Sequence, residues 1–471
     1  MKQEKNTSSK TYRKRILFNA CLASSLVPFM GSSINLALPQ IAREFSMSGI
    51  VQSWTLTSYL LLTAILQVPF GRLADIWGKR TVFITGLSVF LVTTICCGFA
   101  FNSVFFIVFR ALQGVGSAMV FCSNIAIISS VFPPKERGTA MGINAATVYI
   151  SIAAGPSLGG IITQNIGWQY IFFFTAGVSA IALIGSLIVM KDKWIEAKGE
   201  PFDLKGSIIY GLAITALIYG LTILPRMTGF LLMICSAALL FLFVRQESKV
   251  KYPVFHISLL AENKTFRRAS IAALINYAST FPIGFLISLY LQEIKGLDAQ
   301  NAGMILIVQP VIQSVLSPLA GKLSDKIPPR LLSLSGMAII AVVLSAIAFL
   351  LTPESPASLL LIMLGLLGVG FAVFSSPNTN AIMGSVDKKH YSMASATTGT
   401  VRLIGQAFSM GVTTMIISII IGKQAITPAV SAELMKVIHI TFILFATLSA
   451  AGVYLLSTRG KSGENDSMNK G

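Results

Sequence analysis

The decapeptide Gly71-Arg-Leu-Ala-Asp-Ile-Trp-Gly-Lys-Arg80 separates two long apolar stretches of the sequence, residues 53–70 and 81–100. It holds two glycines, one aspartate and three cations, and we expect a tight turn because glycine supplies the backbone freedom that a sharp reversal needs. A related decapeptide, Gly321-Lys-Leu-Ser-Asp-Lys-Ile-Pro-Pro-Arg330, again lies between two apolar runs. This repetition predicts a chain of two related halves in a membrane.

The composition is typical of a membrane protein. Of the 471 residues, 54% are hydrophobic and 11% are charged, whereas soluble domains carry about 25% charged residues. Apolar runs of about 20 residues recur along nearly the whole chain, and each is long enough to cross about 30 Å of hydrocarbon. A β-barrel would show short alternating segments instead. We therefore predict an all-α polytopic membrane protein.

Fourteen apolar segments qualify as membrane spans, and an even number leaves both chain ends on one side. They are residues 16–36, 53–72, 81–100, 104–126, 138–162, 168–190, 204–224, 229–246, 269–292, 300–322, 331–351, 357–380, 395–421 and 437–457. Aromatic residues near the span ends are expected at the membrane–water interfaces. These are Trp54, Trp77, Trp168, Tyr170 and Trp194.

The net charge of +18 is compatible with a nucleic-acid partner, but the placement of the cations indicates a membrane. About 29 of the 36 Lys and Arg fall in alternate connections and at both termini, and about 5 fall in the other connections. Cations concentrate on the cytoplasmic side of membrane proteins. We therefore expect a location in the cell membrane, cytoplasmic N- and C-termini, and no nucleic-acid partner.

The predicted spans group as six, two and six. We expect a basic cytoplasmic N-terminus at 1–15, a first six-helix bundle at 16–190, cytoplasmic linkers with two inserted helices at 191–268, a second six-helix bundle at 269–457 and a cytoplasmic tail at 458–471. Because six is even, both bundles enter the membrane in the same orientation. Parallel halves around a substrate site near the membrane midplane are one known plan of secondary transporters.

Both decapeptides are candidate parts of a conformational gate. The residues concerned are Gly71, Arg72, Asp75, Gly78, Lys79 and Arg80 in the first copy, and Gly321 and Asp325 in the second. Asp75 lies near a helix end, where it could pair with a cation or with the positive N-terminus of a facing helix. The alternative is an ordinary cytoplasmic turn whose cations lie among lipid phosphates. The second copy favours a gate, although Pro328 there replaces the second glycine.

Two cations lie inside predicted spans. Arg110 is about 12 Å from its span boundary at 1.5 Å per residue, and Gly114 beside it allows another helix to pack closely. Arg402 lies at a similar depth from the other side. A buried cation in a span marks function by default, so both are candidates for a coupling or substrate cavity. The alternatives are that Arg110 extends to the interface and that Arg402 pairs with a carboxylate such as Asp387.

Neutral polar residues within the spans supply further candidates for this cavity. They are Asn35, Gln113, Asn144, Gln309, Gln313 and Asn378. Each one alone could instead form a hydrogen bond between helices. No Asp or Glu lies near the middle of a predicted span, and the three histidines lie in connections or at the start of the last span. The sequence therefore supports no metal site, no Ser-His-Asp site and no enzyme activity.

The fifth predicted span carries Gly155, Pro156, Gly159 and Gly160. Small residues four apart form a face on which another helix packs closely, and proline removes a backbone hydrogen bond and bends a helix. This pattern predicts a bent packing helix between two halves that rock against each other. An ordinary small-residue contact is the alternative.

Together these motifs resemble the major facilitator superfamily over essentially the whole chain. The decapeptide 71–80 is similar to the signature turn between helices 2 and 3, Arg110 with Gln113, Gly114 and Gly116 to the helix 4 motif, and the motif 155–160 to the antiporter motif of helix 5. The fourteen spans, Asp203-Leu-Lys-Gly206 and Tyr290-Leu-Gln-Glu-Ile-Lys-Gly296 resemble its fourteen-helix drug:proton antiporter branch. The resemblance implies the major facilitator fold, with two six-helix bundles and two inserted helices. It also implies proton-driven export of hydrophobic, often cationic compounds by alternating access.

One position departs from that branch. Its helix 1 usually carries an aspartate ahead of a stretch like Asn35-Leu-Ala-Leu-Pro39, and here the matching residue is Met30. Two arginines without an acid in the membrane leave the predicted cavity neutral to positive, which disfavours cationic substrates. We therefore expect a monomeric, proton-coupled exporter of hydrophobic drugs or amphiphilic metabolites, which contacts membrane lipids and needs no cofactor, and we hypothesise that neutral or anionic amphiphiles are its better substrates. The alternatives are an exporter, importer, uniporter or lipid flippase for a neutral or anionic solute or lipid without the usual drug:proton coupling, and a membrane sensor without transport.

Overall fold

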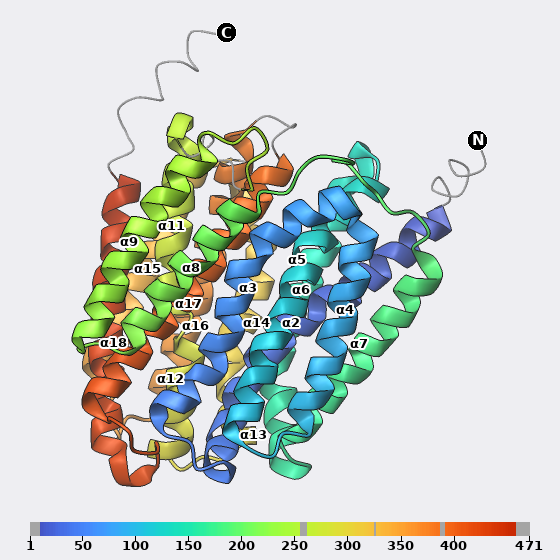
Figure 1. The fold of residues 1–471 in the computed structure, drawn as a ribbon. Coiled ribbons are helices and arrows are strands. Elements are labelled where there is room, and N and C mark those ends of the chain that lie inside the picture. Colours follow the sequence, from blue (N-terminus) through green and yellow to red (C-terminus); the bar gives the residue numbers. More distant parts are fainter. Residues whose placement is uncertain (1–9, 255–260, 325, 387–390, 458–471) are drawn as a thin grey trace.

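The computed structural model describes residues 10–254, 261–324, 326–386 and 391–457, and over these residues 14 helices are long and apolar enough to cross a membrane. The predicted number of spans is therefore confirmed. The helices run side by side as one elongated bundle (Figure 1). We call the end of this bundle at which α2 begins and α18 ends the terminal face, and the other end the opposite face.

The helices follow the chain in three groups. The first bundle contains α2 (Lys10–Glu44), α3 (Gly49–Trp77), α4 (Lys79–Gly98), α5 (Ser103–Val131), α6 (Pro134–Asn165) and α7 (Gln169–Val189). The inserted pair is α8 (Leu204–Thr222) and α9 (Met227–Glu247). The second bundle contains α11 (Lys264–Thr280), α12 (Ile283–Leu289), the π-helical turn η1 (Tyr290–Ile294), α13 (Ala299–Leu306), α14 (Val308–Leu323), α15 (Pro329–Leu350), α16 (Ala357–Gly384), α17 (Tyr391–Ile420), the short 3-10 helix η3 (Pro428–Val430) and α18 (Ser431–Ser457). The described helices thus form two six-span bundles and an inserted pair, as the sequence predicted.

Several helices begin where a polar side chain accepts a hydrogen bond from the first turn. The Asn102 side chain accepts from the Phe105 N–H at 2.8 Å, and the Asp203 side chain accepts from the Gly206 N–H at 2.8 Å. Such a cap satisfies one of the N–H groups that have no partner within the helix. Asp203 therefore has a local structural role at the start of the inserted pair.

The turn expected at 71–80 is much shorter than the decapeptide. Helix α3 continues to Trp77 and α4 begins at Lys79, so Gly78 alone reverses the chain. Its φ of 100° lies in the region that side chains rarely adopt. Residues 71–77 before Gly78 and residues 79 and 80 after it are helical. The expected turn over the whole stretch is therefore corrected to a single residue. In the second copy, residues 324–328 separate α14 from α15.

Two spans of the second bundle are interrupted, and prolines explain both breaks. Pro310 has no N–H to donate to the Leu306 carbonyl, and α13 ends at Leu306. Pro282 likewise separates α11 from α12. The uniform spans 269–292 and 300–322 expected from hydropathy are therefore segmented helices, of which the first ends in the π-helical turn.

The two bundles repeat the same close helix contact. A Cβ on Gly86 of α4 would come within 3.1 Å of the Gly116 carbonyl oxygen of α5, and a Cβ on Gly336 of α15 within 2.7 Å of the Gly370 carbonyl oxygen of α16. Only glycine permits backbones to approach this closely. The shared contact supports the internal duplication inferred from the decapeptides.

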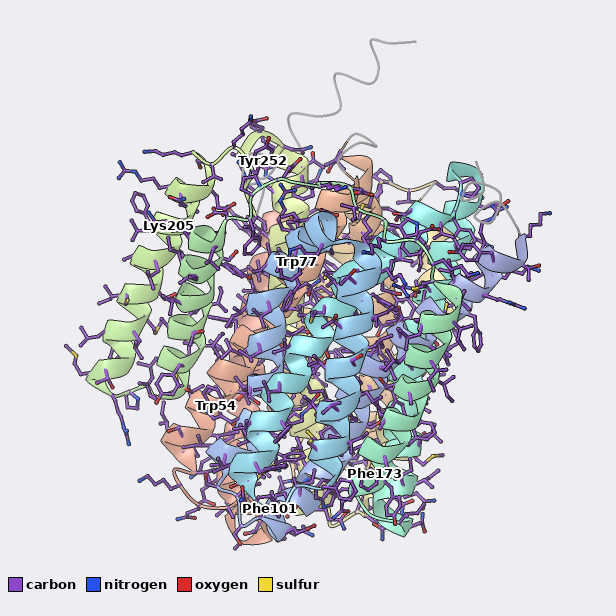
Figure 2. The ribbon with its side chains drawn as sticks, turned by 45° about the vertical axis from the view of Figure 1, so that its right-hand side comes forward. Trp54, Trp77, Phe101, Phe173, Lys205 and Tyr252 are labelled. Atoms are coloured by element: carbon purple, nitrogen blue, oxygen red, sulfur yellow. The ribbon has the colours of Figure 1, made fainter. Side chains whose placement is uncertain are left out.

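Aromatic residues lie near both ends of the bundle, but Trp168 differs from the expectation. Figure 2 shows Trp54, Phe101 and Phe173 toward the opposite face and Trp77 toward the terminal face. Trp168 is fully buried instead of lying at the interface, and its Nε1 donates to Glu44 Oε2 at 2.6 Å. A buried indole N–H needs such an acceptor, so Trp168 anchors the end of α2 rather than the membrane surface.

The inserted pair packs on one side of the two bundles. Helix α8 contacts α3 of the first bundle and α17 of the second. The Tyr210 hydroxyl donates to the Ala64 carbonyl of α3 at 3.1 Å, and Gly411 of α17 faces Leu221. The pair therefore lies across the boundary between the bundles (Figure 1).

Candidate functional site

Arg110 lies wholly inside the first bundle, with 1% of its surface exposed. Its guanidinium donates to Gln113 Oε1 and to the Thr55 carbonyl of α3 at 3.4 Å, and its central carbon is 4.5 Å from the centre of the Tyr59 ring. Gln113 Nε2 in turn donates to Thr94 Oγ1 of α4 at 2.6 Å. Neutral groups on α3, α4 and α5 thus hold the cation, and it does not extend to the interface.

Other predicted cavity residues join neighbouring helices of one bundle. Asn144 Oδ1 accepts hydrogen bonds from Ser24 Oγ at 2.7 Å and from Asn124 Nδ2 at 3.2 Å, which ties α2, α5 and α6 together. Asn378 Nδ2 donates to the Ala269 carbonyl of α11 at 3.1 Å. Asn144, Asn378 and Gln113 therefore form hydrogen bonds between helices, which was the alternative to lining a cavity.

Arg402 lies at the seam, by which we mean the surface where α2, α3, α5 and α6 meet the helices of the second bundle. It is half-buried on α17, and its guanidinium carbon is 5.4 Å from the centre of the Phe121 ring on α5. A cation over an aromatic face is attracted by the ring quadrupole. The alternative partner Asp387 lies outside the described residues. Arg402 is therefore a cation that faces the other bundle.

The seam also holds amide side chains. Asn35 is half-buried on α2, and a Cβ on Gly284 of α12 would come within 2.9 Å of its Nδ2. Gln309 and Gln313 are half-buried on α14. Further buried polar groups have side-chain atoms without a hydrogen-bond partner in the described chain, and on the helices of the seam these include Gln52, Gln67, Asn276 and Thr400. Buried polar atoms of this kind call for a partner, which a polar solute can supply.

The first decapeptide packs against the segment 190–202 that follows α7. Arg80 Nε donates to the Met190 carbonyl at 2.6 Å, and the Lys193 carbonyl would lie 2.7 Å from a Cβ on Gly78. Lys79 forms an ion pair with Glu196. The turn between α3 and α4 is therefore fixed to the linker that leads to the inserted pair.

The remaining residues of the decapeptide extend the same contact. Arg72 forms an ion pair with Glu200, and the Asp75 carbonyl accepts hydrogen bonds from the N–H groups of Glu196 and Ala197 at 3.1 and 3.0 Å. Gly71 lies within α3 and faces Cys122 of α5. Asp75 thus contributes its backbone to the linker contact.

The second decapeptide repeats the arginine contact. Arg330 Nε donates to the Leu456 carbonyl at 3.0 Å and Nη2 to the Ser457 carbonyl at 2.6 Å, at the end of α18. Arg80 makes the equivalent bond at the end of α7. Gly321 faces Ser376 of α16, and Asp325 lies outside the described residues.

The glycines of α6 face two different partners. Gly159 packs on Ser33 of α2, and Ser33 Oγ donates to the Gly155 carbonyl at 3.0 Å. A Cβ on Gly160 would overlap the carbonyl oxygen of Ala299. The helix thus packs on its own bundle and on α13 of the second bundle.

The contact between α6 and α13 has glycine on both sides. The Pro156 carbonyl of α6 lies against Gly303 of α13, where it would overlap a Cβ. Glycine is therefore required where α6 crosses the seam. Within the first bundle, Gly114 similarly lets α5 pack closely on α3, because a Cβ on Gly114 would overlap the Tyr59 carbonyl.

The sequence model of the family described as Major Facilitator Superfamily matches residues 20–261 and 269–470. This chain belongs to the major facilitator superfamily. It is accordingly a multi-pass membrane transporter and not an enzyme. Its fold is similar to the crystal structure of a bacterial homologue of the human lysosomal transporter Spinster in an inward-facing, unoccupied conformation. The TM-score is 0.68 at 16% identity, over 95% of this chain and 97% of the other.

Relatives with curated descriptions are similar to this superfamily member over most of their lengths. The riboflavin transporter RibZ of Clostridioides difficile is 28% identical over 84% of this chain and 86% of its own. The multidrug resistance protein Stp of Mycobacterium tuberculosis is 28% identical over 80% and 71%. The methylenomycin A resistance protein of Bacillus subtilis is 27% identical over 82% and 83%.

One contact of this major facilitator protein went unrecognised in the sequence. Arg43 at the end of α2 and Glu293 in η1 form an ion pair across the seam, with Nη2 2.7 Å from Oε1. Their sequence positions indicated only that charges lie at span ends. The pairing of residues this far apart has no signal in a single sequence. A carboxylate directly after the end of a predicted span, as at Glu293, is the one hint available.

Proposed function

We propose that this transporter is a secondary active exporter of neutral or anionic amphiphiles in the cell membrane. It works by alternating access, exchanges its substrate for protons, and has its terminal face in the cytoplasm. The distribution of Lys and Arg supports the orientation, because cations concentrate on the cytoplasmic side. The decapeptides then lie at the cytoplasmic ends of the helices, where a gate would operate.

Arg402 carries the proposal about substrate charge. Its guanidinium faces Phe121 of the other bundle, and Arg110 lies buried in the first bundle. The sequence has no Asp or Glu in the middle of a membrane-spanning segment. Fixed positive charge in a low-dielectric site repels cations and attracts anions or electron-rich rings. The seam therefore suits a solute with an aromatic surface and a neutral or negative polar group.

The descriptions of the relatives support export of such compounds. They include multidrug resistance, methylenomycin A resistance, tetracenomycin C resistance and export, and riboflavin transport. Riboflavin is a neutral, flat and polar ring system, and so meets the requirements of the seam. The class of substrate inferred here therefore includes flavins.

The experiment uses purified protein in sealed vesicles with an imposed pH gradient. We expect riboflavin and an anionic fluorescein derivative to move only when the gradient is present, and ethidium to move poorly. Robust ethidium transport would contradict the assignment of substrate charge. Substrate movement that is unaffected by collapse of the gradient would contradict proton coupling.

A second candidate, a lipid flippase, has one structural observation in its favour. A hollow of about 170 Å³ lies between α2, α6 and α7, lined by side chains that include Phe29, Ile150 and Phe174. Ile150 is 64% exposed and Phe174 is 48% exposed, so the hollow opens away from the seam. Movement of a fluorescent phospholipid rather than of small dyes in the same vesicles would favour this candidate.

A further inference from the structure

We propose that one outer face of α2 binds a single anionic phospholipid from the leaflet at the terminal face. We call this site the outer groove, by which we mean the stripe of α2 from Thr11 to Phe29 with its walls on α6 and α7. The lipid phosphate rests on Lys14 and Arg15, and an acyl chain follows α2 toward the middle of the membrane. The lipid is a bound ligand and not a transported solute, so the site does not depend on what the protein exports.

A hollow of about 280 Å³ lies at the terminal-face end of the outer groove, between α2 and α7. The first turns of α2 lie there at the outer edge of the molecule (Figure 1). The lining of the hollow combines cations with apolar side chains, and its residues are Thr11, Lys14, Arg15, Phe18, Asn19 and Val189. Phe18 is 63% exposed although it belongs to an apolar span. Such a hollow suits a molecule with an anionic head and a hydrocarbon body.

Two cations of this hollow can receive an anion. Lys14 and Arg15 are both exposed, and neither forms an ion pair with a carboxylate of the described chain. Arg13 beside them pairs with a carboxylate of α6 at 2.7 Å. Asp192, the acid that follows α7, accepts a hydrogen bond from the Tyr12 hydroxyl at 3.4 Å. The hollow therefore carries two positive charges for which the described residues supply no counter-ion.

Asn19 fixes the shape of the hollow. Its buried side chain donates from Nδ2 to the Arg15 carbonyl at 2.9 Å. A Cβ on Gly185 of α7 would overlap Asn19 Oδ1, so glycine lets α7 pack directly on this side chain. The two helices are thus held together in the absence of a ligand. A site that is already formed loses less conformational freedom when it binds.

A second hollow continues the groove toward the middle of the membrane. It has a volume of about 170 Å³, and Ser25 and Phe29 are the parts of its lining that extend the same stripe of α2. The lining positions on α2 repeat at helical spacing, at 11, 14 or 15, 18, 25 and 29. Residues three, four or seven apart share one face of a helix. The basic hollow and the apolar hollow therefore lie along the same face.

The spacing of the two hollows matches one leaflet of a membrane. Phe18 and Phe29 are eleven residues apart, which is about 16 Å along the helix. Half of a hydrocarbon core of about 30 Å is about 15 Å. Ile150 of α6 and Phe174 of α7 border the deeper hollow and are 64% and 48% exposed, so this hollow opens toward lipid. An acyl chain whose phosphate lies on the two cations therefore ends in the apolar hollow.

The combination favours an anionic phospholipid over its two nearest competitors. A free phosphate contacts Lys14 and Arg15 alone and gains nothing from the apolar hollow. A zwitterionic lipid brings its own cation, which the two side chains repel. Each Lys or Arg near an anionic headgroup strengthens binding by a factor of about five.

The test measures binding of dioleoyl phosphatidylglycerol to the full chain, purified in detergent and stripped of lipid, by native mass spectrometry. We expect Lys14→Gln with Arg15→Gln to weaken the tightest binding step about twentyfold, since each cation contributes a factor of about five. The matched control is Lys205→Gln with Lys249→Gln, which removes two exposed cations from the inserted pair at the same face. The control should change the affinity by less than about twofold, because charges outside the groove are screened.

Two further arms separate the head from the chain. Ala154→Leu places a larger side chain into the lining of the deeper hollow and should also weaken binding of the lipid. A phosphatidylglycerol with a photoreactive group at its chain end should crosslink to α2 between Phe18 and Phe29 or to the facing residues of α6 and α7.

Three outcomes would overturn the site. They are an equal loss of affinity in the two double variants, crosslinks confined to other helices, and phosphatidylcholine binding as tight as that of phosphatidylglycerol. Complete displacement of the lipid by an equal concentration of inorganic phosphate would assign the basic hollow to a free anion instead. The substituted cations are all exposed, so folding of these variants is expected to be unaffected. The assay contains no transported solute and no proton gradient, so its result is independent of the export assay.

Discussion

At the scale of single residues, the partner of each buried polar group decides what a substitution does. Arg110 is held by the Gln113 amide, the Thr55 carbonyl and the Tyr59 ring, all of them neutral. Its charge is therefore not cancelled by a carboxylate at this place. The sequence correctly predicted a buried cation but could not indicate that the neighbouring helix α3 supplies the Thr55 carbonyl and the Tyr59 ring.

Replacement of Arg110 tests its part in transport. We expect Arg110→Ala to abolish transport while folded protein is still obtained, with a loss of stability of about 1–3 kcal/mol for the acceptors left without a donor. Arg110→Lys should recover little, because a compact ammonium cannot contact an amide, a carbonyl and a ring at once. Vesicle transport and thermal unfolding are measured together, with the exposed Arg226→Ala as control. Full activity in Arg110→Ala would remove this residue from the mechanism.

Substitution of Arg402 separates substrate charge from substrate size. Arg402→Gln removes the seam cation and keeps a polar side chain over Phe121. We expect the KM for an anionic fluorescein derivative to rise about tenfold or more, since one lost ionic hydrogen bond is worth about 1.5–3 kcal/mol. The KM for neutral riboflavin should change far less. An equal change for both substrates would show that Arg402 does not recognise charge.

At the scale of helices, α6 is the element whose sequence motif matches a close contact. Gly159 packs on α2, while Gly160 packs on α13 of the second bundle. The glycine pattern predicted close packing, but the division of partners between two bundles depends on helix rotation. One step along a helix turns the direction of the side chain by about 100°, and the boundaries of a predicted span are uncertain by more than one residue. The sequence therefore could not indicate which glycine faces which bundle.

Two alanine substitutions on α6 distinguish the seam contact from helix propensity. Gly160→Ala places a methyl group onto the Ala299 carbonyl, so we expect strongly reduced transport and a lower temperature of thermal unfolding. Gly142→Ala is the matched control, because a Cβ there has open space and alanine favours a helix by about 1 kcal/mol. The control should retain transport with equal or higher thermal stability. Similar transport by the two variants would contradict a tight seam at Gly160.

The interruptions of the second bundle could not be predicted to the same extent. Pro282 and Pro310 are visible in the sequence, and each weakens a helix. Hydropathy nevertheless predicts uniform spans there, because it measures length and apolarity alone. The π-helical turn at Tyr290–Ile294 carries Glu293, whose partner Arg43 lies on α2, and local sequence does not encode such a contact. The burial of Trp168 could not be predicted for a related reason, since the acceptor of its indole N–H, Glu44, belongs to another helix.

At the scale of the whole molecule, length, apolarity and duplication were sufficient to predict the fold. The decapeptides and the 14 apolar runs define two related halves, and the structure repeats the arginine contact at Arg80 and Arg330. The boundaries of the five predicted segments remain a prediction. What the sequence could not provide is the set of contacts across the seam, since these depend on how two rigid bundles are docked.

The orientation of the molecule gives a direct prediction. Lys423 lies exposed at the opposite face and Lys249 lies exposed at the terminal face. In a variant without native cysteines, Lys423→Cys should react with an impermeant maleimide in intact cells, whereas Lys249→Cys should react only after the cells are permeabilised. The reason is the concentration of cations on the cytoplasmic side. The reverse pattern would place both chain ends outside the cell.

The inserted pair makes the two flanks of the transporter unequal. Helix α8 contacts both α3 and α17, and so covers the boundary between the bundles on that flank. The flank where α6 meets α13 and α14 carries no such cover from α8 and α9 in the described chain. We therefore expect a compound dissolved among the lipid tails to enter, once the bundles rock apart, from this flank and not from the one that α8 covers. Bulky substitutions along this flank should slow membrane-soluble compounds while water-soluble ones pass as before.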